Sequence, residues 1–60
     1  MCESSVFIIR DGKRRKVMDS VTLITVDKER VALSDILGEG KTIEGRIVRV
    51  DSERHEVYIE

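Results

Sequence analysis

The residue with the most distinctive chemistry in this 60-residue sequence is its single cysteine, Cys2, which follows Met1 directly. If Met1 is retained, its amine, the Cys2 amide nitrogen and the Cys2 thiolate form two fused chelate rings around one metal ion. If Met1 is removed, the new amine and the thiolate still close a five-membered ring. Such a nitrogen and sulfur donor set with a deprotonated amide favours square-planar geometry, which suits Ni(II) or Cu(II) better than Zn(II). The alternative interpretation of Cys2 is a small apolar residue or an inert exposed thiol.

The cysteine count also bears on how so short a chain is stabilised. A 60-residue domain buries only about 60% of its unfolded surface, so an extra constraint is usual at this size. One cysteine rules out an intrachain disulfide, and one Cys with one His cannot build a closed zinc site in a monomer. We therefore expect a homodimer, in which a twofold axis brings a second Cys2 to the same metal ion.

A second candidate site is the run of four cations Lys13, Arg14, Arg15 and Lys16, which could contact the phosphates of RNA. On a strand, however, successive side chains point to opposite faces, so only half of the run points one way. The whole chain has 11 basic and 12 acidic residues, which excludes nucleic-acid binding through bulk charge. A charged, solvated edge strand is the alternative interpretation of this run.

The single histidine, His55, stands after a predicted turn, where solvent exposure is the default. It could act as an extra metal ligand if the fold places it near Cys2.

Other functional classes find little support in the sequence. No serine, cysteine and histidine pattern indicates catalysis, and a domain this small offers little room for a cleft, so we do not expect an enzyme. No apolar run approaches the roughly 18 residues of a membrane span, and no signal peptide is visible. An unpaired cysteine without an export signal indicates a cytoplasmic protein.

The elements that must position these residues are predicted to be strands. Val and Ile make up 15 of the 60 residues and Pro is absent, a composition that suits a pleated sheet. Asp11-Gly12 is a strong hairpin signal, and Ile36-Leu37 is expected to fill the core beneath a loop. The predicted strands cover residues 4–10, 13–18, 21–26, 30–34, 42–51 and 55–60, with 13–18 as an edge. Six short strands in hairpin order predict an antiparallel meander that curls into one small SH3-like or Sm-like barrel over residues 1–60.

The chain also resembles the CooT-like family of small nickel-binding proteins, which are accessory to carbon monoxide dehydrogenase. The resemblance spans essentially the whole chain and is carried by short pieces that are moderately specific in combination. These pieces are Met1-Cys2-Glu3, Asp11-Gly12-Lys13, Met18 ahead of Val21, Leu33, Asp35-Ile36-Leu37-Gly38-Glu39, Lys41, and the closing His55-x-Val57-x-Ile59.

The resemblance implies a β-barrel homodimer that binds Ni(II) through Cys2, with Met1 involved only as the owner of the terminal amine. It implies a role in the maturation of a nickel enzyme such as carbon monoxide dehydrogenase, as a nickel chaperone or store. Loosely described relatives are called predicted RNA-binding proteins, which adds weight to the interpretation of Lys13–Lys16. That run is more basic than expected for the family, in which acidic residues often follow the turn.

Overall fold

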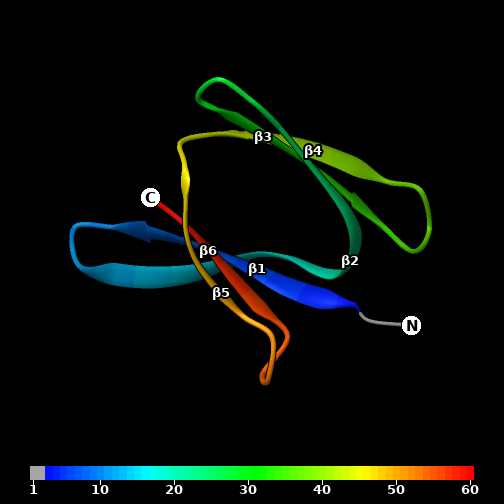
Figure 1. The fold of residues 1–60 in the computed structure, drawn as a ribbon, viewed down its shortest axis with the longest axis horizontal. Coiled ribbons are helices and arrows are strands. Elements are labelled where there is room, and N and C mark those ends of the chain that lie inside the picture. Colours follow the sequence, from blue (N-terminus) through cyan, green and yellow to red (C-terminus); the bar gives the residue numbers. More distant parts are fainter. Residues whose placement is uncertain (1–2) are drawn as a thin grey trace.

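The computed structural model of the chain describes residues 3–60, which form one strongly bent sheet of six strands (Figure 1). The strands are β1 (Ser4–Arg10), β2 (Lys13–Asp27), β3 (Arg30–Asp35), β4 (Gly40–Glu44), β5 (Ile47–Asp51) and β6 (Glu56–Ile59). Their order across the sheet is β4-β3-β2-β1-β6-β5. The predicted all-β fold with six strands is therefore confirmed.

The first hairpin forms where the sequence predicts it. Asp11 and Gly12 both have positive φ, 54° and 73°, as a two-residue hairpin turn requires. Arg10 and Lys13 then face each other as the first pair of the antiparallel β1–β2 ladder. Glycine and aspartate tolerate this left-handed backbone better than most residues, so these two types fix the turn.

β2 is one strand of 15 residues, not the two strands 13–18 and 21–26 that the sequence predicts. Ser20 has φ 56°, and the register shifts on both sides of it, so the chain bends there without losing its pairing. The first half of β2 pairs with β1 and the second half, from Val21, pairs with β3. Among the described residues, the first half of β2 pairs with β1 on one side only. The predicted edge along 13–18 is therefore correct for its other side.

The predicted long strand 42–51 is interrupted at Gly45, so β4 and β5 are separate strands. Gly45 has φ 148°, and a Cβ at this position would lie 2.6 Å from the Glu60 backbone oxygen. Its amide donates to the Glu29 carbonyl at 2.7 Å, while the Glu60 amide donates to the Arg46 carbonyl at 2.8 Å. Only glycine allows so close a crossing, which carries the chain from one part of the sheet to the other.

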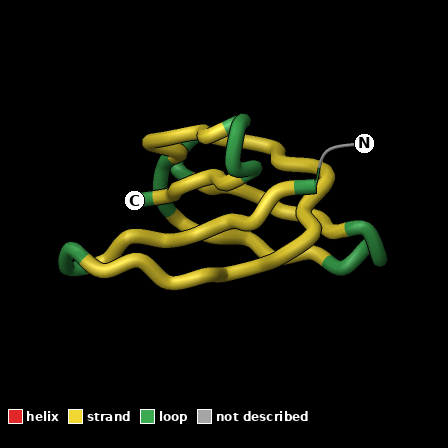
Figure 2. Tube along the Cα trace, turned by 90° about the horizontal axis from the view of Figure 1, so that it is seen from below, coloured by secondary structure: helices red, strands yellow, loops and turns green. Residues whose placement is uncertain are grey.

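The topology differs from the predicted antiparallel meander because β1 and β6 pair in parallel, with Ser5 opposite Glu56 and Ile8 opposite Ile59. The barrel is also open, since in the described part of the chain β4 and β5 are the two edges and do not pair with each other. The bend in β2 instead folds the sheet over itself, as the side view in Figure 2 shows. One part holds β3, β4 and the second half of β2, and the other holds β1, β5, β6 and the first half of β2.

The core lies inside this bend and is small. Its buried members are Val6, Val21, Val31, Leu33, Val57 and Ile59. Burial of β-branched side chains from four strands provides most of the driving force for folding. The side chain of Arg10 links the two parts, because its guanidinium donates to the Glu44 carbonyl at 3.1 Å.

Ile36 and Leu37 do not fill the core as predicted, for they are 53% and 79% exposed. The carboxylate of Asp35 accepts hydrogen bonds from the amides of Leu37 and Glu39, both at 2.9 Å. These bonds form a tight turn that directs the two apolar side chains outward.

Residues 3–60 contain no helix that could cross a membrane.

Candidate functional site

Cys2 and Met1, the predicted metal-binding residues, lie outside the described residues. The structure begins at Glu3, which is exposed, and continues directly into β1. Ser4 pairs with Val21, and Val21 in turn pairs with Asp35. The described chain therefore starts beside the bend of β2, where the two parts of the sheet meet.

His55 lies at the same end of the sheet. Its carbonyl accepts a hydrogen bond from the Ser5 amide at 2.9 Å, and its own backbone has φ 57°. The residue is exposed, as predicted. The parallel pairing of β1 with β6 thus places the turn that ends at His55 next to the first residues of β1. Among residues 3–60, no group of three or more His, Cys, Asp or Glu side chains is arranged to hold a metal ion.

The basic run Lys13–Lys16 is divided between two faces of the sheet, as strand geometry predicts. Lys16 lies opposite Phe7 in the β1–β2 ladder, and Arg15 lies opposite Ile8. Arg14 and Lys16 therefore share the outer face with Phe7. Lys13 and Arg15 share the other face, so the four cations do not form one surface.

The outer face around Phe7 is built from stacked rings and cations. The Phe7 and Tyr58 rings are stacked, with centroids 5.3 Å apart and an angle of 18° between their planes. The Arg14 guanidinium lies over Phe7 at 4.5 Å from the ring centroid, and it also donates a hydrogen bond to the Tyr58 hydroxyl. Arg49 lies 5.8 Å from the Tyr58 centroid and Lys16 lies 5.9 Å from that of Phe7. We call these five residues the aromatic face.

Carboxylates surround the aromatic face and neutralise its cations. Glu56 accepts from the Tyr58 hydroxyl at 2.7 Å and lies 3.8 Å from Arg14, and Asp51 lies 3.6 Å from Arg49. Asp19 lies 3.3 Å from Lys16. The hydrogen bond from the Ser5 hydroxyl, followed by that from Lys16, lowers the pKa of Asp19 below its usual value.

This geometry bears on the predicted RNA site. Phe7 and Tyr58 are each only 8% exposed, so their rings do not offer a bare platform on which bases could stack. Arg14 and Lys16 are already paired with carboxylates. The alternation of side chains along β2 separates Arg14 and Lys16 from Lys13 and Arg15. RNA binding by all four cations stays a prediction. The sequence alone did not reveal the aromatic face, because its stacked pair depends on the parallel β1–β6 pairing.

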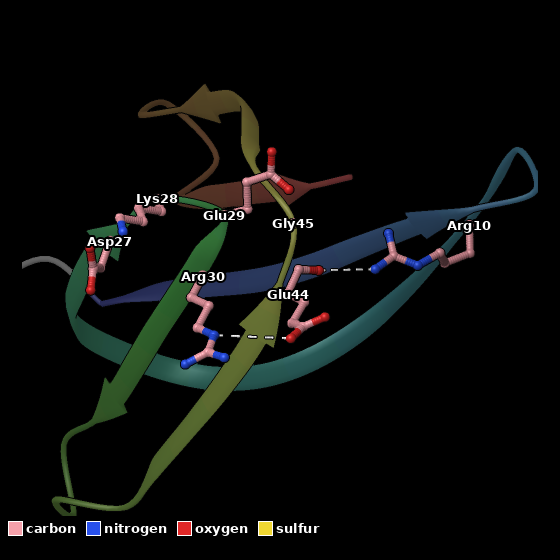
Figure 3. A pocket seen from close by; sticks show the side chains of 7 residues that line it. All are labelled: Arg10, Asp27, Lys28, Glu29, Arg30, Glu44 and Gly45. Atoms are coloured by element: carbon pink, nitrogen blue, oxygen red, sulfur yellow. Dashed lines mark hydrogen bonds and ion pairs between the residues drawn. The ribbon is translucent and has the colours of Figure 1, made fainter.

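Figure 3 shows a hollow that is lined by residues from both parts of the sheet. Its lining residues are Arg10, Asp27, Lys28, Glu29, Arg30, Glu44 and Gly45. Three cations and three carboxylates balance here, and Arg30 lies 4.0 Å from Glu44. The Arg10 guanidinium reaches across to the Glu44 carbonyl. This hollow has no net charge to attract an ionic ligand, and its contacts link the two parts of the sheet.

Comparison with known proteins gives consistent matches along the chain. An uncharacterized protein from Methanothermobacter thermautotrophicus is 33% identical over 60 residues, which cover 100% of this chain and 89% of the relative. Another uncharacterized protein, from Archaeoglobus fulgidus, is 37% identical over 43 residues, which cover 72% of this chain and 96% of the relative.

Comparison with solved structures identifies a crystal structure assigned to CooT from Carboxydothermus hydrogenoformans. It matches with a TM-score of 0.89 and 29% sequence identity, over 98% of this chain and 95% of that one. The family model described as CO dehydrogenase accessory protein CooT matches residues 1–60. Since the sequence match and the fold agree over the full described chain, the protein belongs to the CooT family of CO dehydrogenase accessory proteins.

Proposed function

We propose that this protein binds Ni(II) through Cys2 at the interface of a homodimer and holds or delivers the metal for maturation of a nickel enzyme such as carbon monoxide dehydrogenase. The observation that carries the proposal is the position of the single cysteine, at residue 2 of a chain that belongs to a family of CO dehydrogenase accessory proteins. A terminal amine, a backbone amide and a thiolate are a donor set that suits Ni(II).

The proposed homodimer is supported by the outer surface of the part of the sheet that holds β3, β4 and the second half of β2. Because Val31 and Leu33 of β3 point into the core, their neighbour Ala32 points outward. The cross-strand partners of Ala32 and Ser34 on this outer side carry no charge, and the charged set Arg30, Asp27 and Glu44 lies at one end of it. We call this the neutral face; it consists of Leu23, Thr25, Ala32, Ser34 and Thr42. An uncharged, flat sheet surface suits packing against a second sheet.

The solvent-exposed area of the chain also supports the proposed homodimer. The chain exposes 4510 Å², whereas a compact monomer of this mass is expected to expose roughly 4,000 Å². Leu23, at the end of the neutral face nearest the bend, is 60% exposed. Dimerisation through this face would cover apolar surface that the small core leaves in contact with water.

The proximity of the neutral face to the start of the described chain connects the dimer with the metal. Leu23 follows Val21 by two residues, and Val21 pairs with Ser4 at the beginning of β1. Two copies joined along this side of β2 would thus bring the starts of their first strands toward a common axis. A shared Ni(II) ion would then receive donors from both chains.

Nickel titration of the wild type and of Cys2→Ala tests the proposal. We expect thiolate-to-nickel absorption in the wild type that saturates at one Ni(II) per two chains, and none in Cys2→Ala. Binding should fall at acid pH because the thiol and the terminal ammonium group must each lose a proton before they can bind the metal. Native mass spectrometry of the same samples gives the stoichiometry and the state of Met1.

Two controls sharpen this experiment. His55→Gln tests whether the imidazole of His55, whose carbonyl contacts the Ser5 amide, adds a donor; weaker nickel binding by this variant would identify it as a ligand. Extending the N-terminus by one glycine moves the amine away from Cys2 and should change the spectrum while keeping the thiolate. Equal nickel binding by Cys2→Ala and the wild type would refute the proposed site, and one Ni(II) per chain would refute its sharing.

A further inference from the structure

The two cations of the basic run that do not join the aromatic face lie in a hollow at the end of the first hairpin. The hollow measures about 390 Å³ and is lined by Ile8, Arg10, Asp11, Lys13 and Arg15. We call it the cationic pocket. Three of its side chains are basic and one is acidic, in a chain whose overall charge is −1. Three basic residues and one acidic residue give the lining of the pocket a net charge of +2.

The ladder register explains why these side chains converge. Arg10 faces Lys13, and Ile8 faces Arg15, in the β1–β2 ladder. The two pairs are separated by one pair, so their side chains lie on the same face. Alternation along each strand places the four side chains together. Ile8 forms an apolar floor between the cations. The pocket is thus a fixed product of the hairpin and its Asp11-Gly12 turn.

The pairing of Arg10 with Lys13 is unfavourable for the fold by itself. Like charges directly opposite each other in a ladder destabilise a sheet, and Arg15 adds a third cation on the same face. Arg10 is held by the Ile9 and Glu44 carbonyls, at 3.2 Å and 3.1 Å. Among residues 3–60, no carboxylate lies within ion-pairing distance of Lys13 or Arg15. Neither of these two side chains therefore belongs to an ion pair within the described chain.

We propose that the cationic pocket binds a phosphate group. Arginine and lysine together supply a planar fork and a point charge, which suit the oxygen atoms of a phosphate. A volume of this size accommodates a phosphate and the first atoms attached to it, and Ile8 can contact an apolar portion of such a ligand. Asp11 on the wall disfavours a deeper approach by a second anionic group.

The pocket is independent of the proposed nickel site. Arg10 ends β1, at the far end of the strand from Ser4, and Lys13 pairs with it from β2, whereas Cys2 precedes β1 in the sequence. Phosphate binding should therefore be the same in the wild type and in Cys2→Ala. Failure of either proposal leaves the other standing.

Titration of the isotopically labelled protein with inorganic phosphate, followed by amide NMR at constant ionic strength, tests the inference. We expect saturable shifts at Ile8, Asp11, Lys13 and Arg15, and at least ~10-fold weaker binding by the double variant Lys13→Ser/Arg15→Ser. The matched control Lys28→Ser/Arg54→Ser removes the same charge elsewhere and should bind as the wild type does. No saturable shift, or equal weakening by both double variants, would overturn the proposal.

Two further ligands identify the source of the phosphate. A nucleoside monophosphate that binds more tightly than a short RNA of mixed sequence indicates a small phosphomonoester. Tighter binding of the RNA, with loss in Lys13→Ser/Arg15→Ser and a steep salt dependence, indicates a phosphodiester backbone. Shifts from either ligand that avoid the pocket residues count against the proposal.

Discussion

The outer surfaces of the two parts of the sheet are built in opposite ways. The aromatic face places two stacked rings under Arg14, Lys16 and Arg49, and surrounds them with carboxylates. The neutral face has the same strand geometry but carries short side chains without charge, with Ala32 at its centre. One surface is covered by its own side chains, and the other is left open.

This difference shows how a very small sheet protein can protect both of its sides. A bent sheet of six strands encloses only one core. The apolar parts of each outer surface must therefore be covered in some other way. On the aromatic face the stems and guanidinium groups of arginine provide the cover. At the centre of the neutral face, Thr25, Ala32 and Thr42 are too short to cover the sheet, which supports the proposed packing of this face against a second copy of the chain.

The largest effect is expected where the chain crosses between the two parts. Gly45→Ala should lower the free energy of unfolding by about 3 kcal/mol, because its Cβ meets the Glu60 backbone and its φ of 148° is strained for alanine. Urea denaturation measures this loss. Gly12→Ala is the matched control, since nothing lies within 4 Å of its Cβ; its φ of 73° should cost only about 1–2 kcal/mol. Equal losses in the two variants would contradict the role of the crossing.

The next effect separates the two faces directly. Ala32→Arg should weaken the homodimer roughly 100-fold, because a twofold axis through the neutral face brings two unpaired cations together. Native mass spectrometry and light scattering over a dilution series measure the dissociation. Ser52→Arg adds the same charge on an exposed turn and should leave the dimer intact. A dimer that withstands Ala32→Arg would show that the chains associate elsewhere.

A smaller effect is expected on the aromatic face. Arg14→Ala should lower the free energy of unfolding by about 1 kcal/mol through loss of its stacking on Phe7. Arg14→Lys keeps the charge but loses the planar group, so its midpoint in urea should fall between those of Arg14→Ala and the wild type. Neither change should alter the oligomeric state. Dissociation of the dimer by Arg14→Ala would instead place this face at the interface.

The smallest effect concerns Asp19 at the rim of the aromatic face. Its pKa is lowered in the folded protein, so its contribution to stability is fully present above 3.8 and is lost as the pH falls through the lower folded value. Asp19→Asn should therefore be slightly less stable than the wild type near neutral pH, and this difference should vanish in acid. Ser5→Ala removes the main hydrogen bond and should reproduce part of the effect. A difference that grows on acidification would contradict the assigned direction.

The local features of the fold were predictable from the sequence. Asp11-Gly12 predicted its hairpin, and the abundance of Val and Ile predicted a sheet. Alternation along the strand predicted that Lys13–Lys16 would divide between two faces. These signals arise from residues that are close together in the sequence, so they can be recognised in a single sequence.

The features that were not predicted from the sequence depend on contacts between residues that are distant along the chain. The continuity of β2, predicted as two strands over 13–18 and 21–26, depends on the bend at Ser20, which the hydrophobic pattern does not indicate. The separation of β4 from β5 follows from the approach of Gly45 to Glu60, and the aromatic face follows from the pairing of β1 with β6. In the candidate site, metal binding by Cys2 stays a prediction, whereas the contact of His55 with Ser5 depends on the parallel pairing of β1 with β6.

The parallel pairing of β1 with β6 has a consequence for biosynthesis. Ser5 cannot acquire its partner until Glu56 has been translated, so the centre of the sheet forms only after nearly all of residues 3–60 have left the ribosome. Contacts this distant in sequence slow folding, and the early strands remain unpaired on one side meanwhile. The turn that ends at His55 therefore reaches the first residues of β1 only late in synthesis, so the proposed nickel site would be completed after almost all of residues 3–60 have been made.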